Sequence, residues 1–152
     1  MELRIAGLND LPTLLHHRVE MFREMGFTDP AQLADVTSAA ETYFRTALGD
    51  GTYRAWLAVT EEGEVMGGGG LLIAPWPGFP GEKQSCRAWI LNMYTEPSYR
   101  RRGVARRIIH TILDWCRAEG FTAVALHAST DGRALYESFG FRPTNEMRLR
   151  FT

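Results

Sequence analysis

The sequence is poor in cysteine and in long apolar runs. Its two cysteines, Cys86 and Cys116, cannot build a disulfide framework, and their spacing is not that of a metal site. Every apolar run is far shorter than the ~20 residues of a membrane helix, and the N-terminal MELRIAGLND lacks the pattern of a signal peptide. These absences predict a reduced, cytoplasmic protein with no membrane partner and no metal.

The sequence also lacks an excess of charge of either sign. It carries 17 basic and 18 acidic residues, so its formal net charge is −1, whereas nucleic-acid-binding domains are usually strongly basic. At 152 residues, of which 45% are hydrophobic and 23% charged, the chain suits one globular domain, residues 1–152, that can bury a proper core. We therefore expect a single domain without a nucleic-acid partner.

Hydrophobic periodicity predicts a mixed α/β sheet. Helices are predicted at residues 11–25, 30–48, 104–117 and 131–139. Strands are predicted at residues 2–5, 53–60, 65–74, 87–95 and 121–128, with further strand material at Phe141 and 146–151. Four consecutive glycines, 67–70, lie inside one predicted strand, where glycine often marks a bulge or a close backbone approach. The loop 75–85 (PWPGFPGEKQS) separates the predicted hairpin from the next strand.

Positive charge is concentrated in one short stretch, residues 99–107 (YRRRGVARR), which holds five arginines around Gly103. The stretch lies between a predicted buried strand and the first turn of an amphipathic helix. A helix N-terminus presents unpaired N–H groups and a positive dipole end, and glycine lets a ligand approach the backbone closely. The pattern therefore predicts an anion site suited to phosphate. It matches neither a Walker loop nor a dinucleotide fingerprint.

Two segments resemble the GNAT superfamily of N-acetyltransferases. Residues 100–105 (RRRGVA) fit the family's acyl-CoA pyrophosphate loop, Gln/Arg-x-x-Gly-x-Gly/Ala, and residues 134–141 (ALYESFGF) resemble its A-x-x-Leu-Tyr-Glu-x-x-Gly-Phe segment with slightly altered spacing. The resemblance is sharp over residues 87–142 and topological before them. It implies a GNAT-like acyl-CoA N-acyltransferase fold, with a central mixed sheet, splayed fourth and fifth strands and about four helices. It also implies a homodimer.

The resemblance implies transfer of an acetyl group from acetyl-CoA to a primary amine, by direct attack in a ternary complex. The positions that match the family's CoA contacts are Met93, Thr95, Arg100, Arg101, Arg102, Gly103, Val104, Ala105, Arg106 and Ser129. The backbone of Met93 and Thr95 would pair with the pantetheine arm and polarise the thioester carbonyl. At Ser129 the family often has an asparagine, so this contact departs from the pattern.

Tyr136 matches the tyrosine that in the family often protonates or stabilises the departing CoA thiolate. Ordinary pKa values of about 10 for tyrosine and 8.5 for a thiol make this proton donation uphill by about 2 kcal/mol. That cost is tolerable for a hydroxyl aimed at the sulfur. An ordinary packed aromatic is the alternative interpretation of this side chain.

The acceptor and the general base stay open in the sequence. The titratable candidates for the base are His16, His17, Glu20, Glu24 and His127. Asn92 cannot act as a base but could orient water or the acceptor. We expect the loop 75–85 and the two N-terminal helices to form the acceptor wall. The acceptor could be a small-molecule amine, an amino acid, an antibiotic or a protein N-terminus. Two alternatives to catalysis are an acyl-CoA-binding sensor and a nucleic-acid-binding module that uses Arg100–Arg107.

Overall fold

The computed structural model describes residues 1–151, and over these residues it shows a five-stranded mixed sheet with four α-helices. The strands are β1 (Glu2–Ile5), β2 (Tyr53–Val59), β3 (Val65–Pro75), β4 (Cys86–Thr95) and β5 (Val124–Leu126). The helices are α1 (Leu11–Glu24), α2 (Pro30–Asp50), α3 (Val104–Ala118) and α4 (Arg133–Glu137). Strands β1 to β4 pair antiparallel in chain order, and β5 joins β4 in parallel through the α3 crossover.

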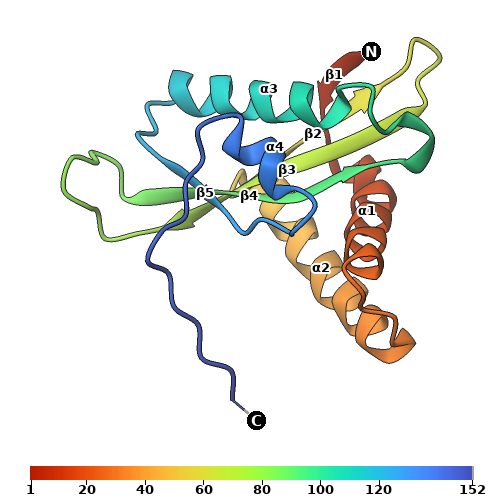
Figure 1. Cartoon of the computed structure of the whole chain (residues 1–152), viewed down its shortest axis with the longest axis horizontal. Coiled ribbons are helices and arrows are strands. Elements are labelled where there is room, and N and C mark those ends of the chain that lie inside the picture. Colours follow the sequence, from red (N-terminus) through yellow and green to blue (C-terminus); the bar gives the residue numbers. More distant parts are fainter. Residues whose placement is uncertain (152) are drawn as a thin grey trace.

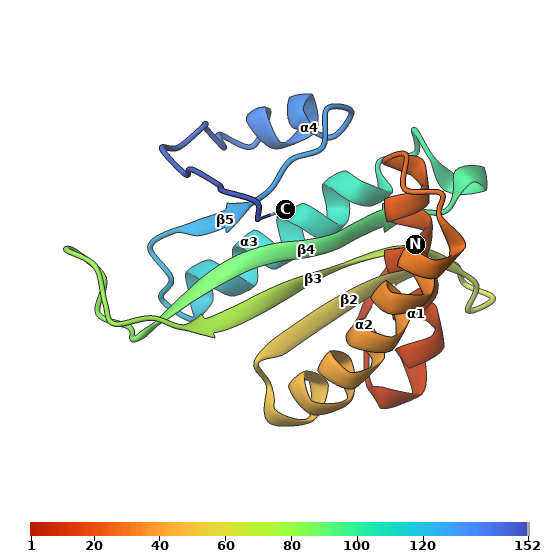
Figure 2. The same ribbon diagram turned by 90° about the horizontal axis from the view of Figure 1, so that it is seen from below.

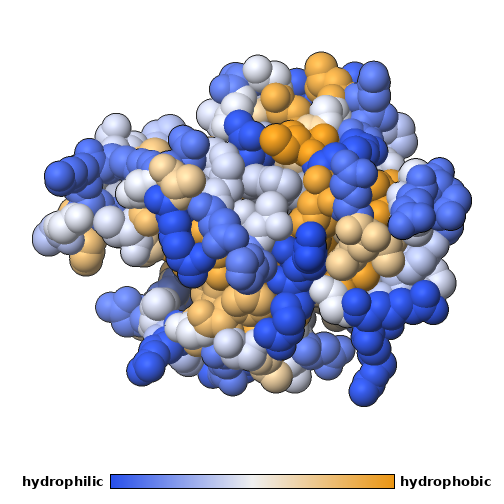
Figure 3. All heavy atoms as spheres, turned by 90° about the horizontal axis from the view of Figure 1, so that it is seen from above, coloured by the Kyte–Doolittle hydropathy of each residue, from blue (hydrophilic) through white to orange (hydrophobic). Residues whose placement is uncertain are grey.

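Helices cover both faces of the sheet, as Figure 1 shows: α1 and α2 lie on one face and α3 on the other. Each face buries its own core. The core on the α1 and α2 side includes Leu14, Phe44, Tyr53 and Leu57, and the core on the α3 side includes Trp56, Leu71, Ile90, Ile108 and Ile112. Seen from the α3 side, hydrophilic side chains make up most of the outline of the molecule, and hydrophobic atoms show between them and at the upper edge (Figure 3). Over residues 1–151, no helix combines the length and the hydropathy that crossing a bilayer requires.

Strands β4 and β5 separate part of the way along β4, as the sequence predicts. Their pairs run only from Ala88 with Val124 to Ile90 with Leu126. Within the described chain, residues 91–95 of β4 have no partner strand on that side, and Figure 2 shows β5 beside only the first part of β4. The second half of β4 therefore presents a free backbone edge next to α3 and α4.

The glycine run of β3 makes room for large side chains of the neighbouring strands. A Cβ atom at Gly70 would lie 1.8 Å from the Tyr53 hydroxyl oxygen, and one at Gly69 would lie 2.3 Å from the Met93 sulfur. The β3–β4 register also shifts between Gly68 and Gly70. The close approach predicted at these glycines is present, and the bulge lies opposite them in β4, between Leu91 and Tyr94.

Replacing Gly70 by alanine should destabilise the fold strongly, because the new methyl group would displace the fully buried Tyr53 ring. We expect the free energy of unfolding to fall by about 3 kcal/mol, the upper range for overpacking a core. Chemical denaturation measures this change. Gly49→Ala is the matched control: Gly49 lies within α2 with open space around it, so alanine there should stabilise by about 0.5–1 kcal/mol. Equal stability of the two variants would contradict the packing argument.

Three predictions for the C-terminal third differ from the structure. The strand predicted at residues 121–128 shortens to β5, Val124–Leu126, and the helix predicted at 131–139 shortens to α4, Arg133–Glu137. The strand material predicted at Phe141 and 146–151 is absent from the described residues, where this tail is exposed coil that leaves the body of the molecule (Figure 1). A strand forms its backbone hydrogen bonds with a neighbouring strand. Because β5 has only three residues, it offers the tail a short edge for pairing.

Candidate functional site

The free edge of β4 is shaped by a bulge at Asn92. Asn92 has a φ of 56°, in the left-handed region that few side chains other than asparagine adopt. After the bulge, the Glu96 N–H donates to the Met66 carbonyl of β3 at 2.9 Å. Because N–H groups alternate along a strand, the N–H groups of Met93 and Thr95 point away from β3, towards the gap between β4 and β5.

The N-terminus of α3 lies next to this edge and is open. The Arg107 N–H closes the first helical turn onto the Gly103 carbonyl at 3.0 Å. The N–H groups of Val104, Ala105 and Arg106 come before this first bond, so they have no carbonyl acceptor within the helix. Gly103 has a φ of 79°, and, apart from the adjoining backbone and its two neighbouring residues, no heavy atom of the described chain lies within 4 Å of the place a Cβ would take. The turn thus presents backbone donors to open space, which is the geometry of an anion site.

The arginine side chains around this turn are partly held by the protein itself. Arg100 pairs with Glu24 of α1 and donates from Nε to the Thr95 carbonyl at 3.1 Å. Arg106 reaches α4, where Nη2 lies 3.3 Å from the Ser138 hydroxyl. Arg101 and Arg102 are exposed. This arrangement gathers charge around one turn rather than spreading it over a wide face, which disfavours the nucleic-acid interpretation.

Tyr136 and Ser129, both predicted site residues, meet at the start of α4. The Ser129 hydroxyl accepts a hydrogen bond from the Gly132 N–H at 3.1 Å, and a Cβ at Gly132 would lie 3.1 Å from the Tyr136 ring. The ring also packs edge-on against Phe141, with centroids 5.9 Å apart. Burial raises the pKa of Tyr136 to about 12. The hydroxyl therefore holds its proton more firmly than an exposed tyrosine.

A cavity of about 230 Å³ lies between α1, α2 and β4. It is lined by Arg18, Phe22, Val36, Ala39, Ala40, Tyr43, Phe44, Leu91 and Asn92. Its wall is mostly apolar and aromatic, with Arg18 as its charged member. The sequence analysis missed Arg18. A basic residue three positions after Leu15 and four before Phe22, on the inward stripe of the first helix, is the signal that could have revealed it.

A buried hydrogen-bond chain fixes the position of Arg18. Arg18 Nη1 donates to Asn92 Oδ1 at 2.5 Å, and Asn92 Nδ2 donates to the Tyr53 hydroxyl at 2.9 Å. Asn92 and Tyr53 are both buried. Asn92, in its left-handed conformation, thus holds the guanidinium of Arg18 by a hydrogen bond. This contact lies where the free edge of β4 begins.

The candidate bases separate into different environments. His16 lies 3.0 Å from Glu96, and His17 is buried with Nε2 3.3 Å from the same carboxylate, although without hydrogen-bond geometry. The remaining candidates are each held by another charged side chain: Glu20 by Arg23, Glu24 by Arg100 and His127 by Glu146 of the C-terminal tail. The structure therefore places His16, His17 and Glu96 together near the end of β4.

His17 should make the stability of the protein sensitive to acid. Burial lowers its pKa to about 4, whereas an unfolded histidine titrates near 6.5. As the pH falls below about 6.5 the unfolded chain binds the proton first, so stability is fully present above that pH and is lost towards pH 4. We expect this residue to cost about 3 kcal/mol of unfolding free energy between pH 7 and pH 4. Denaturation of the parent and of His17→Gln at both pH values isolates the effect; identical pH dependence would contradict it.

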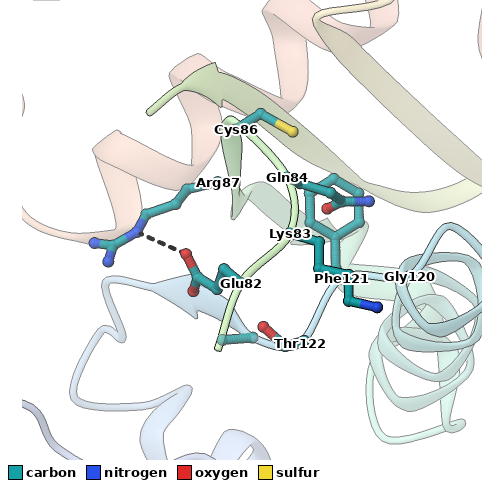
Figure 4. Close-up of a pocket in the computed structure, with 9 residues that line it drawn as sticks. Glu82, Lys83, Gln84, Cys86, Arg87, Gly120, Phe121 and Thr122 are labelled. Carbon is teal, nitrogen blue, oxygen red and sulfur yellow. Dashed lines mark ion pairs between the residues drawn. The ribbon is translucent and has the colours of Figure 1, made fainter. Parts of the chain in front are cut away.

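The loop 75–85 is anchored away from this cavity. The Arg87 guanidinium lies 4.0 Å from the Trp76 ring centroid and 3.8 Å from Glu82, and Gln84 donates to the Glu119 carbonyl at 2.6 Å. Glu82, Gln84 and Arg87 line a cavity of about 10 Å³, room for about one water molecule, and Figure 4 shows their side chains around it. Of the described residues, those that line the 230 Å³ cavity come from α1, α2 and β4. The two N-terminal helices predicted for the acceptor wall thus line this cavity, and the loop 75–85 does not.

Over residues 1–151, no group of three or more His, Cys, Asp and Glu side chains is placed to hold an ion. Cys86 and Cys116 are both free thiols.

Comparison with known proteins agrees with this geometry. The model of the acetyltransferase (GNAT) family matches residues 13–141. Human N-acetyltransferase 8 is 30% identical over 94 residues, which are 60% of this chain and 39% of that protein. The uncharacterized N-acetyltransferase YjgM of Escherichia coli (strain K12) is 36% identical over 90 residues, 57% of this chain and 50% of that protein. The chain thus spans half or less of the length of these curated relatives.

Solved structures share the fold over almost the whole chain. A GCN5-related N-acetyltransferase from Ralstonia eutropha JMP134 has a TM-score of 0.91 and 32% identity, covering 99% of this chain and 97% of that chain. An acetyltransferase from Clostridium acetobutylicum, solved with acetyl-CoA, has a TM-score of 0.87 at 23% identity, covering 99% and 95%. This second likeness shows the fold alone. Because the family model matches residues 13–141, well over half of the sequence, the chain belongs to the GNAT acetyltransferase family.

Proposed function

We propose that the chain transfers the acetyl group of acetyl-CoA to a primary amine by direct attack within a ternary complex. One observation carries the proposal: the open N-terminus of α3 at Gly103 lies beside the unpaired half of β4. A diphosphate fits the first, and an amide-rich arm with a thioester fits the second. Acetyl-CoA joins these groups in one molecule and supplies the activated acetyl group.

The residues present fit this co-substrate. The N–H groups of Val104, Ala105 and Arg106 would hold the diphosphate, and the exposed guanidinium groups of Arg101 and Arg102 would add attraction from outside the turn. The side chains of Arg100 and Arg106 would act mainly by fixing the turn against α1 and α4. Ser129 keeps a hydroxyl proton to donate while its oxygen accepts from Gly132.

The free N–H groups of β4 would serve the reaction itself. Met93 and Thr95 would pair with the arm, and a donor there would stabilise the charge that builds on the carbonyl oxygen as the amine attacks. In this transfer an N–C bond forms, the C–S bond breaks, and the proton lost by the amine balances the thiol that leaves.

Tyr136 would act on the departing sulfur mainly as a hydrogen-bond donor. With its pKa raised to about 12, complete proton donation to a thiolate of pKa about 8.5 is uphill by about 5 kcal/mol. This free-energy cost is more than twice the cost of about 2 kcal/mol that the ordinary pKa values of tyrosine and a thiol give. A hydrogen bond to the thiolate stabilises the charge without transferring the proton.

A thiol-release assay with acetyl-CoA tests the proposal. The panel contains an alkyl amine, α-amino acids, an aminoglycoside and a peptide with a free N-terminus, with CoA binding measured by calorimetry alongside. We expect CoA to bind and thiol to appear only when an acceptor is present. Binding without turnover across the panel would instead support a sensor, and absence of CoA binding would overturn the site. The homodimer and the cytoplasmic location stay predictions from the sequence.

A further inference from the structure

The cavity between α1, α2 and β4 contains a charge without a counter-charge. Arg18 is half-buried on its wall and contacts Asn92 Oδ1 at 2.5 Å and the Phe22 ring at 5.0 Å. Among residues 1–151 it forms no ion pair, in contrast to Arg4, Arg45 and Arg100, each of which has a carboxylate partner. Its pKa is lowered because burial removes water from the guanidinium.

A guanidinium in such a place is suited to an incoming anion. A charge taken out of water is unfavourable unless it is paired, and Asn92 satisfies one of the five N–H donors of Arg18. The planar fork of arginine matches a carboxylate through two parallel hydrogen bonds. The contact with Asn92 holds the guanidinium in position, so little side-chain entropy remains to be lost on binding.

A negative charge, the Glu96 carboxylate, lies just beyond the end of β4, further along the chain than Asn92. Glu96 has a side chain that is 24% exposed and lies beside His16 and the buried His17. Burial, followed by the carboxylates of Glu96 and Glu24, raises the pKa of Tyr94 on this strand. Met93 lies between Asn92, which holds Arg18, and Glu96. It follows Asn92 directly, at the ~3.8 Å spacing of adjacent Cα atoms. A molecule with a carboxylate at Arg18 would therefore place an α-ammonium group near Met93, at the start of the free edge, while Glu96 lies three residues further along the chain.

The size and lining of the cavity limit the rest of the molecule. Its volume of about 230 Å³ is below the ~300–1,000 Å³ of sites for drug-sized ligands. Phe22, Tyr43 and Leu91 offer an apolar and aromatic surface. An aminoglycoside is too large and too polar for this space, and an internal peptide residue lacks the free carboxylate.

We infer that the acceptor is a small amino acid-like molecule, with a free carboxylate bound by Arg18, an apolar or aromatic side chain in the cavity, and its α-amine at the free edge of β4. This inference rests on the proposed acetyl transfer and names its acceptor class. The product is the N-acetylated amino acid and free CoA: the amine nitrogen bonds to the acetyl carbon, the C–S bond breaks, and the amine loses one proton as the thiol forms.

The test compares three acceptors that share an amine and a phenyl ring: L-phenylalanine, L-phenylalaninamide and 2-phenylethylamine. The carboxylate is present in the first, replaced by a neutral amide in the second and absent in the third. For the parent enzyme, kcat/KM should be highest with phenylalanine. In Arg18→Gln it should fall about 10- to 100-fold for phenylalanine, the loss of a charge-assisted hydrogen-bond pair. It should change less than about threefold for 2-phenylethylamine, which makes no such bond.

Arg45→Gln is the matched control, because Arg45 lies exposed on α2 and pairs with Glu41 outside the cavity. We expect it to leave all three kcat/KM values unchanged. Acetyl-CoA affinity of Arg18→Gln, measured by calorimetry, reports whether the fold and the donor site are intact. An equal loss for all three acceptors with normal CoA binding, or a parent enzyme indifferent to the carboxylate, would overturn the inference.

A binding measurement separates failure of this inference from failure of the proposed function. If the parent enzyme acetylates none of the three acceptors, the thermal shift caused by phenylalanine and by phenylalaninamide in the presence of CoA still tests the cavity. A shift by phenylalanine that is lost in Arg18→Gln supports the carboxylate site even without turnover. A shift by neither compound, or the same shift by both, overturns it. Turnover of other amines without this preference leaves the acetyl transfer standing and removes the acceptor class.

Discussion

Gly103→Asp should lose at least about 100-fold in acetyl-CoA affinity, because the new carboxylate would occupy the open space in front of the α3 N-terminus. Apart from the adjoining backbone and the two neighbouring residues, no heavy atom of the described chain lies within 4 Å of that position, so the side chain would enter the place proposed for the diphosphate. Two like charges 4 Å apart repel by about 4 kcal/mol near a protein surface, which corresponds to about 1,000-fold in affinity. Isothermal calorimetry with CoA measures the loss directly.

The chain provides a close control for the backbone effect of this substitution. Gly51, at the end of α2, has a φ of 79° and a ψ of 7°, and Gly103 has 79° and 8°; both have open space around them. Gly51→Asp should therefore suffer a similar conformational penalty, about 1–2 kcal/mol, while retaining CoA affinity. Gly103→Asn separates bulk from charge and should bind CoA better than Gly103→Asp. Normal CoA affinity in Gly103→Asp would remove the phosphate site from this turn.

Tyr136→Phe should lower kcat by about 10- to 100-fold while CoA affinity stays nearly unchanged. The substitution keeps the ring that packs against Phe141 and removes only the hydroxyl. The loss of one hydrogen bond to a developing charge is worth about 1.5–3 kcal/mol, which sets this range. A loss near 10⁴-fold would instead indicate full general acid catalysis.

Steady-state kinetics and CoA calorimetry on the same variant check this prediction. A change in KM for acetyl-CoA together with CoA affinity would indicate that the hydroxyl holds the co-substrate in place. Unchanged kcat would remove the catalytic role and leave Tyr136 as a packed aromatic. Tyr136→Leu, which also removes the ring, should lose CoA affinity or stability in addition.

The long periodic elements of this fold could be predicted from the sequence, and the short C-terminal ones could not. The stripe that includes Val104, Ile108 and Ile112 has a clear helical period, and all three residues are buried in α3. The alternation of Met147, Leu149 and Phe151 is equally typical of a strand, yet all three are exposed and unpaired in the described structure. Periodicity reports which face a segment could bury, whereas a strand also needs a neighbour with a free edge.

The donor side of the site follows from local sequence, and the acceptor side does not. The glycine before α3 and the arginines around it lie within a few residues, so the turn could be predicted from its own chemistry. Arg18 and Asn92 lie far apart in the sequence and meet only after α1 packs against β4. The left-handed conformation of Asn92 depends on the bulge opposite the glycine run. Tertiary packing therefore creates the cavity. The hydrophobic periodicity of a single segment cannot predict it.

The missing side chain at Gly70 lets β2 reach, through Tyr53 and Asn92, the wall of the proposed acceptor cavity. The Tyr53 ring crosses above β3 at this glycine, and its hydroxyl holds Asn92, which in turn holds Arg18. Tyr53, which lies two strands away from the free edge of β4, thus helps to fix the orientation of the Arg18 guanidinium. Directed evolution of acceptor preference would accordingly find useful changes on β2 as well as on the helices, because a shorter side chain at position 53 releases Arg18 without altering any atom that touches the substrate.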